Sequence, residues 1–403
     1  MKYYKNIELA KLQNVSEKAV RNWIQAALEG KLELQLYEEG DRNYIANTSK
    51  NVAIIEEVVQ KGKKFRNSRG FKIVKPKPAF YKLYTSEQIF NIISSIDIYR
   101  EIPHQYSYFD GGAKYWDLYS HKLLTESTPN LLNSTVELLG LHQAYLDNLL
   151  GDYQQVNVVD VGAGNGLPVR HFLEHLLSTG KLGRYVGIDL SNNMLDIAER
   201  NFKKWFGDRV TLERSIKDIN RDRFTDILIN DAFNESGTIP NVMLFFGGTI
   251  ANSRHPQQQF QTVHDSMGKQ DLLLFAYKLD TPRSRRYFDF GTESASLDLQ
   301  EKVVPELLNI DESLYEVEQF FDENQRERQI QIRLKVAISI EFNLNNQPRV
   351  LDLNKGDAIL LWRSKHWDLL ETINFFENSG FDLIQTARSK DQECILLVAK
   401  IKS

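Results

Sequence analysis

The chain has 403 residues, of which 42% are hydrophobic and 26% charged, and a formal net charge of −4 at pH 7. This composition excludes a disordered chain, and the length allows two or three domains. No run approaches the roughly 20 apolar residues that span a bilayer, and no apolar signal core opens the sequence, so we expect a cytoplasmic protein without membrane contact. Cys394 is the only cysteine, which excludes a disulfide framework and a cysteine-based metal cluster, and we expect no metal site.

The first 68 residues have the pattern of a small helical module with a β-hairpin. The expected elements are helices over 7–12, 17–28 and 49–65 and a hairpin over 32–44. Ser16 is suited to cap the second helix. The whole resembles the winged helix-turn-helix domains of the MerR type. Residues 1–78 are basic, with 16 Lys and Arg against 9 Asp and Glu, so a DNA partner is possible, but Glu17 on the exposed face leaves a protein partner open.

A basic, proline-containing segment over 69–80 is expected to be a linker. A helix over 85–99 follows it. The segment after Pro103 reads HQYSYFDGGAKYWDLYS and gathers many aromatic side chains in a short span. We expect most of them in the core of a helical cap over a sheet, whereas a few, Trp116 among them, are candidates to line a substrate pocket.

The rest of the chain is organised around residues 156–190. A Val-rich run over 156–161 is typical of a parallel strand buried on both faces, and a glycine turn follows it directly at the start of a helix. A second strand over 185–190 ends near Asp189, whose carboxylate can accept hydrogen bonds from two ribose hydroxyls. The candidate cofactor-binding residues here are Asp160, Gly162, Ala163, Gly164, Gly166 and Asp189.

The turn and the acid together form the string D-x-G-x-G-x-G followed by an acid at the end of the next strand. This string resembles the first two motifs of class I S-adenosylmethionine (SAM) methyltransferases, whereas an NAD-binding turn more often reads G-x-G-x-x-G. The resemblance implies SAM as the cofactor. Asp218, in a loop after a short strand over 210–212, is a candidate to bind the adenine amino group or else a plain polar loop residue.

Further strands are expected over 225–229, which would be the fourth, and over 243–246. The second of these runs into a loop that contains Asn252. Because open α/β sheets bind ligands at the carboxyl ends of their strands, this amide, with one acceptor and two donors, lies at the expected active edge. Material inserted after a strand over 270–278 suits a substrate lid, and two strands over 381–387 and 393–401 end the chain.

From about Ile102 to the C-terminus, the chain resembles the histidine-specific α-N-methyltransferases of ergothioneine biosynthesis and their relatives acting on tryptophan derivatives. The matching segments are IPHQYSYFDGGAKYWDLY, VVDVGAGNG, VGIDLS, FFGGTIAN, RRYFD, QIQIRL and RSKHWDLLETINFFENSGF, of which FFGGTIAN is the most specific. The resemblance implies an α/β fold: a class I SAM methyltransferase sheet of the Rossmann-like type, with a second α/β domain that closes over an amino-acid substrate. The winged module precedes both.

The resemblance also implies roles for single residues. Asn252 falls on the asparagine that binds the substrate amino group, Tyr287 on the tyrosine at its carboxylate, and Ser364 on a serine near its side chain. Trp362 stands where the family has the glutamate that holds imidazole, and Phe109 where it has a substrate-facing tyrosine. The loss of the acid removes the obvious partner of a histidine ring, and a tryptophan favours an apolar or aromatic side chain instead.

We therefore expect a SAM-dependent N-methyltransferase that acts on the amino group of an amino acid or a derivative, not on free histidine, with Asn252 and Tyr287 as catalytic residues. The alternatives are a SAM-responsive DNA-binding regulator and a methyltransferase whose peptide, carrier-bound or nucleic-acid substrate is recruited by the module. The expected domains are the winged module (1–68), the linker (69–80), a methyltransferase domain with an N-terminal helical cap (81–280), a substrate-binding lid insertion (281–370) and a return to the methyltransferase sheet (371–403).

Overall fold

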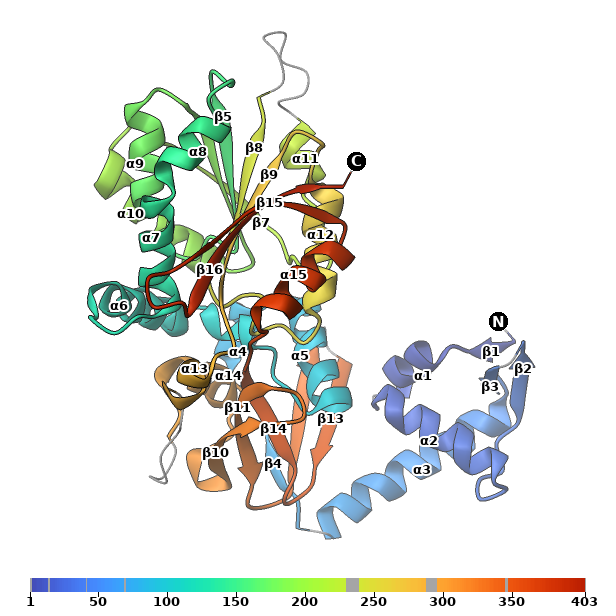
Figure 1. Cartoon of the computed structure of the whole chain (residues 1–403). Coiled ribbons are helices and arrows are strands. Elements are labelled where there is room, and N and C mark those ends of the chain that lie inside the picture. Colours follow the sequence, from blue (N-terminus) through green and yellow to red (C-terminus); the bar gives the residue numbers. More distant parts are fainter. Residues whose placement is uncertain are drawn as a thin grey trace.

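The computed structural model describes residues 2–13, 15–40, 42–68, 70–229, 239–287, 296–344 and 347–402, with the backbone alone at 62–68, 284, 286 and 287. Three groups of elements make up the chain (Figure 1): a small N-terminal module, a large sheet flanked by helices, and a second unit of helices and two smaller sheets. Within the described ranges, none of the helices combines the length and the apolar character needed to cross a membrane.

The large sheet has seven strands. They are β5 (Val156–Val161), β6 (Leu182–Asp189), β7 (Leu212–Ile216), β8 (Asn241–Phe245), β9 (Leu272–Lys278), β15 (Phe381–Arg388) and β16 (Cys394–Ile401). Their order is β7-β6-β5-β8-β9-β16-β15, and the first five are parallel whereas β16 and β15 run antiparallel. The chain order reverses between β5 and β8, which is where an open α/β sheet binds its ligand.

Helices cover both faces of this sheet. They are α7 (Leu131–Leu141), α8 (Gln143–Leu149), α9 (Arg170–Ser178), α10 (Asn192–Phe206), α11 (Thr225–Ile229), α12 (Pro256–Ser266) and α15 (Leu369–Asn378). All six residues of β5 are buried, and neighbours in it belong to different cores: Val158 packs in the core on one face of the sheet and Val159 in the core on the other. The prediction of a central strand that is buried on both faces is therefore correct.

The second unit joins two distant parts of the chain. It contains the sheets β10 (Tyr315–Asp322), β11 (Glu327–Leu334), β14 (Ala358–Lys365) and β4 (Lys72–Val74), β12 (Ile338–Leu344), β13 (Gln347–Leu353), with helices α4 (Pro78–Leu83), α5 (Ser86–Tyr99), η1 (His104–Tyr108), α6 (Gly111–Thr125), α13 (Pro282–Tyr287), α14 (Leu299–Leu307) and η2 (Glu312–Leu314). One hydrophobic core is shared by residues from Val74 to Phe109 and from Leu297 to Leu361.

Two predictions need correction here. The segment over 69–80 is not a linker throughout, because β4 pairs in parallel with β12 and Val74 is buried in the shared core. The helical cap expected at the start of the 81–280 domain does not lie wholly over the large sheet, because the apolar face of α5, including Ile92 and Ile96, packs inside the second unit. In both cases the partner strands lie far away in sequence, where local patterns give no signal.

The strand expected over 225–229 is also wrong, since these residues form helix α11. Phe224 and Leu228, four residues apart, are both buried in the same core, which is the spacing of a helix face. The fourth parallel strand of the sheet is β8, which pairs with β5.

The N-terminal module contains the helices and the hairpin expected from the sequence. Its elements are β1 (Tyr3–Tyr4), α1 (Asn6–Gln13), α2 (Glu17–Leu28), β2 (Leu36–Glu39), β3 (Arg42–Ala46) and α3 (Ser49–Ser68). Ser16 caps α2 through a hydrogen bond that its Oγ accepts from the backbone of Ala19 at 3.1 Å. A small core, including Leu9, Val20 and Ile45, lies between the helices and the hairpin. Its resemblance to MerR-type modules stays a prediction.

The packing of the glycine turn can be tested by one matched pair of variants. Gly166 and Gly180 both have left-handed φ angles, +74° and +70°, but an added Cβ at Gly166 would lie 2.6 Å from the buried ring of Phe202, whereas at Gly180 it would meet nothing within 4 Å. Both alanine variants bear a backbone cost of roughly 1 kcal/mol. We expect Gly166→Ala to lower the free energy of unfolding by about 1–3 kcal/mol more, because the ring must move. Urea denaturation measures both, and equal losses would contradict this packing.

Candidate active site

The glycine turn leaves β5 and reaches the carboxyl end of β6. The backbone N–H groups of Gly162 and Ala163 both donate to Ile188 O, at 2.9 and 3.0 Å, which closes the turn against the neighbouring strand. Gly164 N then donates to Asp189 Oδ2 at 3.0 Å. Burial raises the pKa of Asp189, and hydrogen bonds from backbone N–H groups oppose that shift. The carboxylate is thus fixed, half-buried, beside the turn.

The three glycines of this turn, Gly162, Gly164 and Gly166, all have positive φ angles, a backbone conformation that favours glycine. A Cβ added at Gly164 would meet Met194 Cε at 3.8 Å and Trp116 Nε1 at 3.9 Å, which are ordinary van der Waals contacts, so both side chains lie against the turn. Trp116 on α6 therefore lies next to the turn, and its role in lining a substrate pocket stays a prediction. With Asp189 able to take ribose hydroxyls, the residues present fit SAM. Within the described residues, no group of three or more His, Cys, Asp or Glu is placed to hold a metal ion.

Two predicted cofactor residues have other partners. Asp160 is buried and accepts a hydrogen bond from Tyr185 Oη at 2.7 Å, and burial raises its pKa to about 7. Its carboxyl is thus held by a side chain of the next strand. Asp218, also buried, accepts from Asn220 N and Nδ2 at 3.1 and 2.8 Å, with Gln105 Nε2 at 3.5 Å. An adenine amino group would have to share or replace these donors.

The loop after β8 brings Asn252 to the turn. A Cβ on Gly162 would lie 3.0 Å from Thr249 Oγ1, so this loop packs directly on the glycine turn. Asn252 N donates to Gly248 O at 2.9 Å, and its side-chain amide lies 3.4 Å from the position a Cβ of Gly248 would take. The half-buried amide is therefore held close to the cofactor turn.

Strand β14 of the second unit joins this loop. Lys365 N donates to Ala251 O at 2.9 Å, which places Ser364 beside the residue that precedes Asn252. Ser364 and Trp362 are two residues apart on the strand and so share one face. The structure thus brings Ser364 of the second unit beside the loop of Asn252, with Trp362 on the same face of β14.

Buried charges hold the same junction. Glu101 Oε2 accepts from Arg254 Nε and from Arg363 Nη2, both at 2.6 Å, and Arg363 also contacts Glu327 at 3.1 Å. Arg254 follows Asn252 by two residues, and Arg363 stands between the two substrate residues of β14. Removal of one partner from such a buried pair typically costs roughly 3–5 kcal/mol. Glu101 was not predicted from the sequence, because its partners lie far away in the chain.

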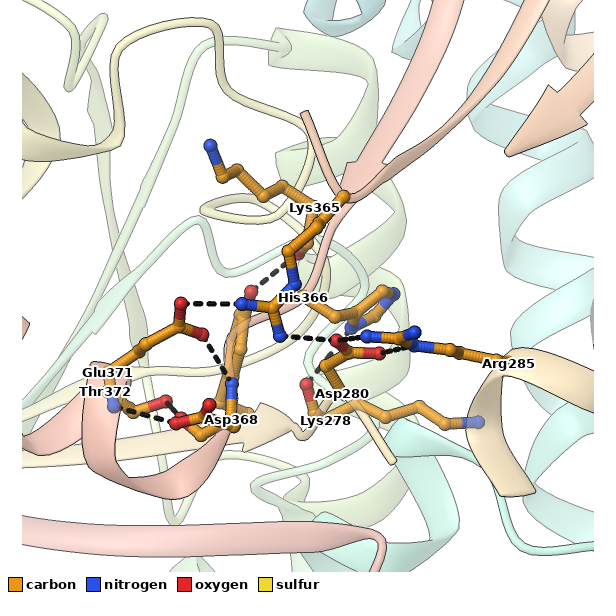
Figure 2. Close-up of polar contacts among 10 residues, drawn as sticks. Lys278, Asp280, Arg285, Lys365, His366, Asp368, Glu371 and Thr372 are labelled. Carbon is orange, nitrogen blue, oxygen red and sulfur yellow. Dashed lines mark hydrogen bonds and ion pairs between the residues drawn. The ribbon is translucent and has the colours of Figure 1, made fainter. Parts of the chain in front are cut away.

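A histidine adjoins Ser364. His366 Nε2 lies 2.9 Å from Ser364 Oγ, and its Nδ1 lies 3.0 Å from the backbone oxygen of Lys278 (Figure 2). Burial lowers the pKa of His366 to about 4, and the nearby cations Arg328 and Lys278 act in the same direction. The ring is therefore neutral at pH 7.

Two further predicted residues differ in how they are placed. Tyr287 ends α13, and its side chain lies outside the described part, so its contact with a carboxylate stays a prediction. Phe109 is buried in the core of the second unit with its ring 5.2 Å from that of Tyr84, so it is a packing residue there. The backbone oxygen of its neighbour Tyr108 accepts a hydrogen bond from Ser191 Oγ at 2.6 Å, close in sequence to Asp189.

Helix α13 is anchored by a network around Asp280 (Figure 2). Arg285 donates two hydrogen bonds to Asp280, at 2.7 and 2.6 Å, and Arg326 donates a third at 2.5 Å while its other arm reaches Glu371. Burial opposes ionisation, but these arginines lower the pKa of Asp280. The network fixes the backbone just before Tyr287 relative to β9 and α15.

Comparisons with known proteins found a matching family and similar solved structures. The family described as histidine-specific methyltransferase, SAM-dependent, matches residues 88–401. Among curated proteins, none matches the chain. Similar solved structures include SAM-dependent methyltransferases from Clostridium acetobutylicum (TM-score 0.41, 12% identity, 72% of this chain and 98% of that one) and Anabaena variabilis (0.37, 15%, 73% and 96%). A third is the 1,6-didemethyltoxoflavin-N1-methyltransferase from Burkholderia thailandensis (0.36, 12%, 75% and 91%).

The raised pKa of Asp160 predicts a pH effect on stability. The folded protein keeps this proton up to about pH 7, whereas the unfolded chain loses it near 3.8, so the stabilising contribution is complete below about pH 3.8 and is lost as pH rises through 7. Asp160→Asn cannot ionise and still accepts from Tyr185. We expect the free energy of unfolding of the variant, relative to the parent, to increase from about pH 4 to 8. Urea denaturation across pH without cofactor measures this, and a constant difference would contradict it.

Proposed function

The chain belongs to the SAM-dependent family described as histidine-specific methyltransferases, and we propose that it methylates the amino group of an amino acid or derivative other than free histidine. The hydrogen bond from Lys365 N to Ala251 O carries this proposal. It places Asn252, matched to the family residue that binds the acceptor amine, beside the strand of Trp362 and Ser364. The amine and the side chain of one small acceptor can thus be bound together.

The surroundings of Trp362 support an aromatic or apolar acceptor side chain. This half-buried indole replaces the acid that the family resemblance assigns to imidazole. Glu101 and Glu327, acids close to the same strand, are both held by Arg363, so their charges are already compensated. An imidazolium would find a ring to stack on here, but a packed aromatic or apolar group gains more from the same surface.

Methyl transfer mainly requires that the acceptor nitrogen, the methyl group and the sulfur are aligned. SAM supplies, when bound, an electrophilic methyl group on a positively charged sulfur. The protein has to hold the acceptor nitrogen in line, and proximity and orientation provide most of the acceleration. We propose that the Asn252 amide oxygen accepts one amine N–H and so directs the lone pair. An α-amino group has a pKa of about 7.7–8.0, so partial desolvation is enough to keep it neutral.

Replacing Asn252 tests the acceptor role. We expect Asn252→Ala to reduce turnover at least about 100-fold, because the lone pair is no longer aimed, and to leave the Kd for SAM within about twofold. Asn252→Asp keeps an acceptor oxygen and should recover part of the rate. Mass spectrometry of the twenty amino acids and a cell extract after incubation with labelled SAM measures turnover and names the acceptor. Unchanged turnover in the alanine variant would exclude this role.

Replacing Asp189 tests the cofactor site. Asp189→Ala removes the acceptor for two ribose hydroxyls, so we expect SAM to bind at least about tenfold more weakly, at roughly 1 kcal/mol or more for each hydrogen bond. Asp226→Ala, which removes an exposed acid paired with Lys217, is the matched control and should leave affinity unchanged. Calorimetry measures both, and equal affinities in the two variants would refute the ribose contact.

One observation favours a second candidate function, DNA binding by the N-terminal module. An open groove between α1, α2 and β3 is lined by three cations, Lys5, Arg21 and Arg42, and by one acid, Glu17. We propose that it contacts DNA phosphates, and expect binding of duplex DNA that weakens steeply with salt. Arg21→Glu with Arg42→Glu should abolish the shift in a mobility assay, while the remote change Lys390→Glu should not. DNA binding that does not weaken with salt, or that persists in the double variant, would rule out phosphate contacts in this groove.

A further inference from the structure

The contact of His366 with Lys278 settles which ring nitrogen carries the proton. A backbone carbonyl oxygen only accepts hydrogen bonds, and His366 Nδ1 lies 3.0 Å from Lys278 O (Figure 2), so Nδ1 must donate. In a neutral imidazole the other nitrogen then carries the lone pair. His366 Nε2, 2.9 Å from Ser364 Oγ, is therefore an acceptor.

The surroundings keep this ring neutral. His366 is buried, with 9% of its surface exposed, and both of its nitrogens are used. Arg328 and Lys278 oppose a second proton, and Asp280, which acts in the opposite direction, does not outweigh burial. A doubly protonated ring would donate from Nε2 to Ser364 Oγ, and the serine hydroxyl would then need another acceptor for its own proton.

A neutral His366 fixes the direction of the Ser364 hydroxyl. A serine hydroxyl has one donor and two lone pairs, and here the donor is consumed by Nε2. Only lone pairs of Ser364 Oγ remain for another partner. The backbone of Ser364 lies beside the loop of Asn252, and its side chain is on the same face of β14 as Trp362, which is where the proposed function puts the acceptor side chain.

We propose that His366 sets Ser364 as an obligatory hydrogen-bond acceptor, and that the enzyme therefore selects amines whose aromatic side chain carries an N–H or O–H donor. This inference rests on the proposed function, because it assumes that the side chain of the acceptor reaches Ser364. His366 is a positioning residue in this arrangement, since it acts through the serine. An acceptor side chain without a donor would leave the serine lone pairs buried and unpaired. The resulting loss of binding free energy is larger than that caused by a missing methylene group.

Isosteric pairs of amino acids test the donor rule. Tryptophan and 3-benzothienylalanine share shape but differ in the ring N–H, and tyrosine and phenylalanine differ in the O–H. We expect kcat/KM to favour the donor-bearing member of at least the pair that fits beside Trp362, by about tenfold or more. Ser364→Ala should bring that ratio close to one.

Variants of His366 separate a positioning role from a structural one. His366→Phe frees the serine hydroxyl to donate, so the ratio should fall towards one, whereas His366→Gln offers an amide oxygen near the position of Nε2 and should retain most of it. A residue needed only for folding would lower kcat/KM for both members of a pair equally. An unchanged ratio in His366→Phe would overturn the proposal.

The proton position can be measured without any acceptor. Long-range ¹H–¹⁵N correlation spectra of the full chain with ¹⁵N-labelled histidine should show His366 with its proton on Nδ1 between about pH 5.5 and 8, where an unperturbed histidine would titrate. A proton on Nε2, or on both nitrogens, overturns the proposal.

The outcomes separate the two claims. Equal kcat/KM within both pairs, with methylated product formed, overturns the donor rule and leaves the proposed function standing. No methylation of any amino-acid amine overturns the proposed function, and the donor rule with it.

Discussion

The site depends on the ion pairs that the buried carboxylate of Glu101 forms with two arginines. This carboxylate accepts from Arg254 of the large sheet unit and from Arg363 of the second unit, both at 2.6 Å. In a poorly solvated interior such a shared carboxylate is strong only while every partner stays in place. Because Arg254 follows Asn252 closely and Arg363 lies between Trp362 and Ser364, the groups that would hold the two ends of an acceptor are fixed by one charge cluster.

The glycine turn adjoins the same junction. Its backbone donates to Asp189 and to the end of β6, and Thr249 packs on it, so cofactor turn, acid and asparagine loop are a continuous set of contacts. The parallel strands bring these loops to one edge, where open α/β sheets bind their ligands. Methyl transfer needs orientation more than covalent help, so this rigid junction suits the family's chemistry.

The features that could be predicted from the sequence are those formed by residues close to one another along the chain. The Val-rich strand, the glycine turn and Asp189 are encoded within about one βαβ unit, and the structure places them as expected. Residues 225–229 were misread because five residues with Ile and Thr do not distinguish a strand from a helix, and 72–74 because β4 finds its partner, β12, far along the chain. Glu101 and His366 also act through distant partners.

The most direct test of the central claim, that the two units enclose one methyl-transfer site, is a crystal structure of the full chain with S-adenosylhomocysteine. We predict the ribose on Asp189, the adenosyl group along the turn at 162–166, and the sulfur directed towards Asn252 with Ser364 across the same cavity. A ligand bound elsewhere, or a turn closed by Trp116 with no space for it, would contradict the account.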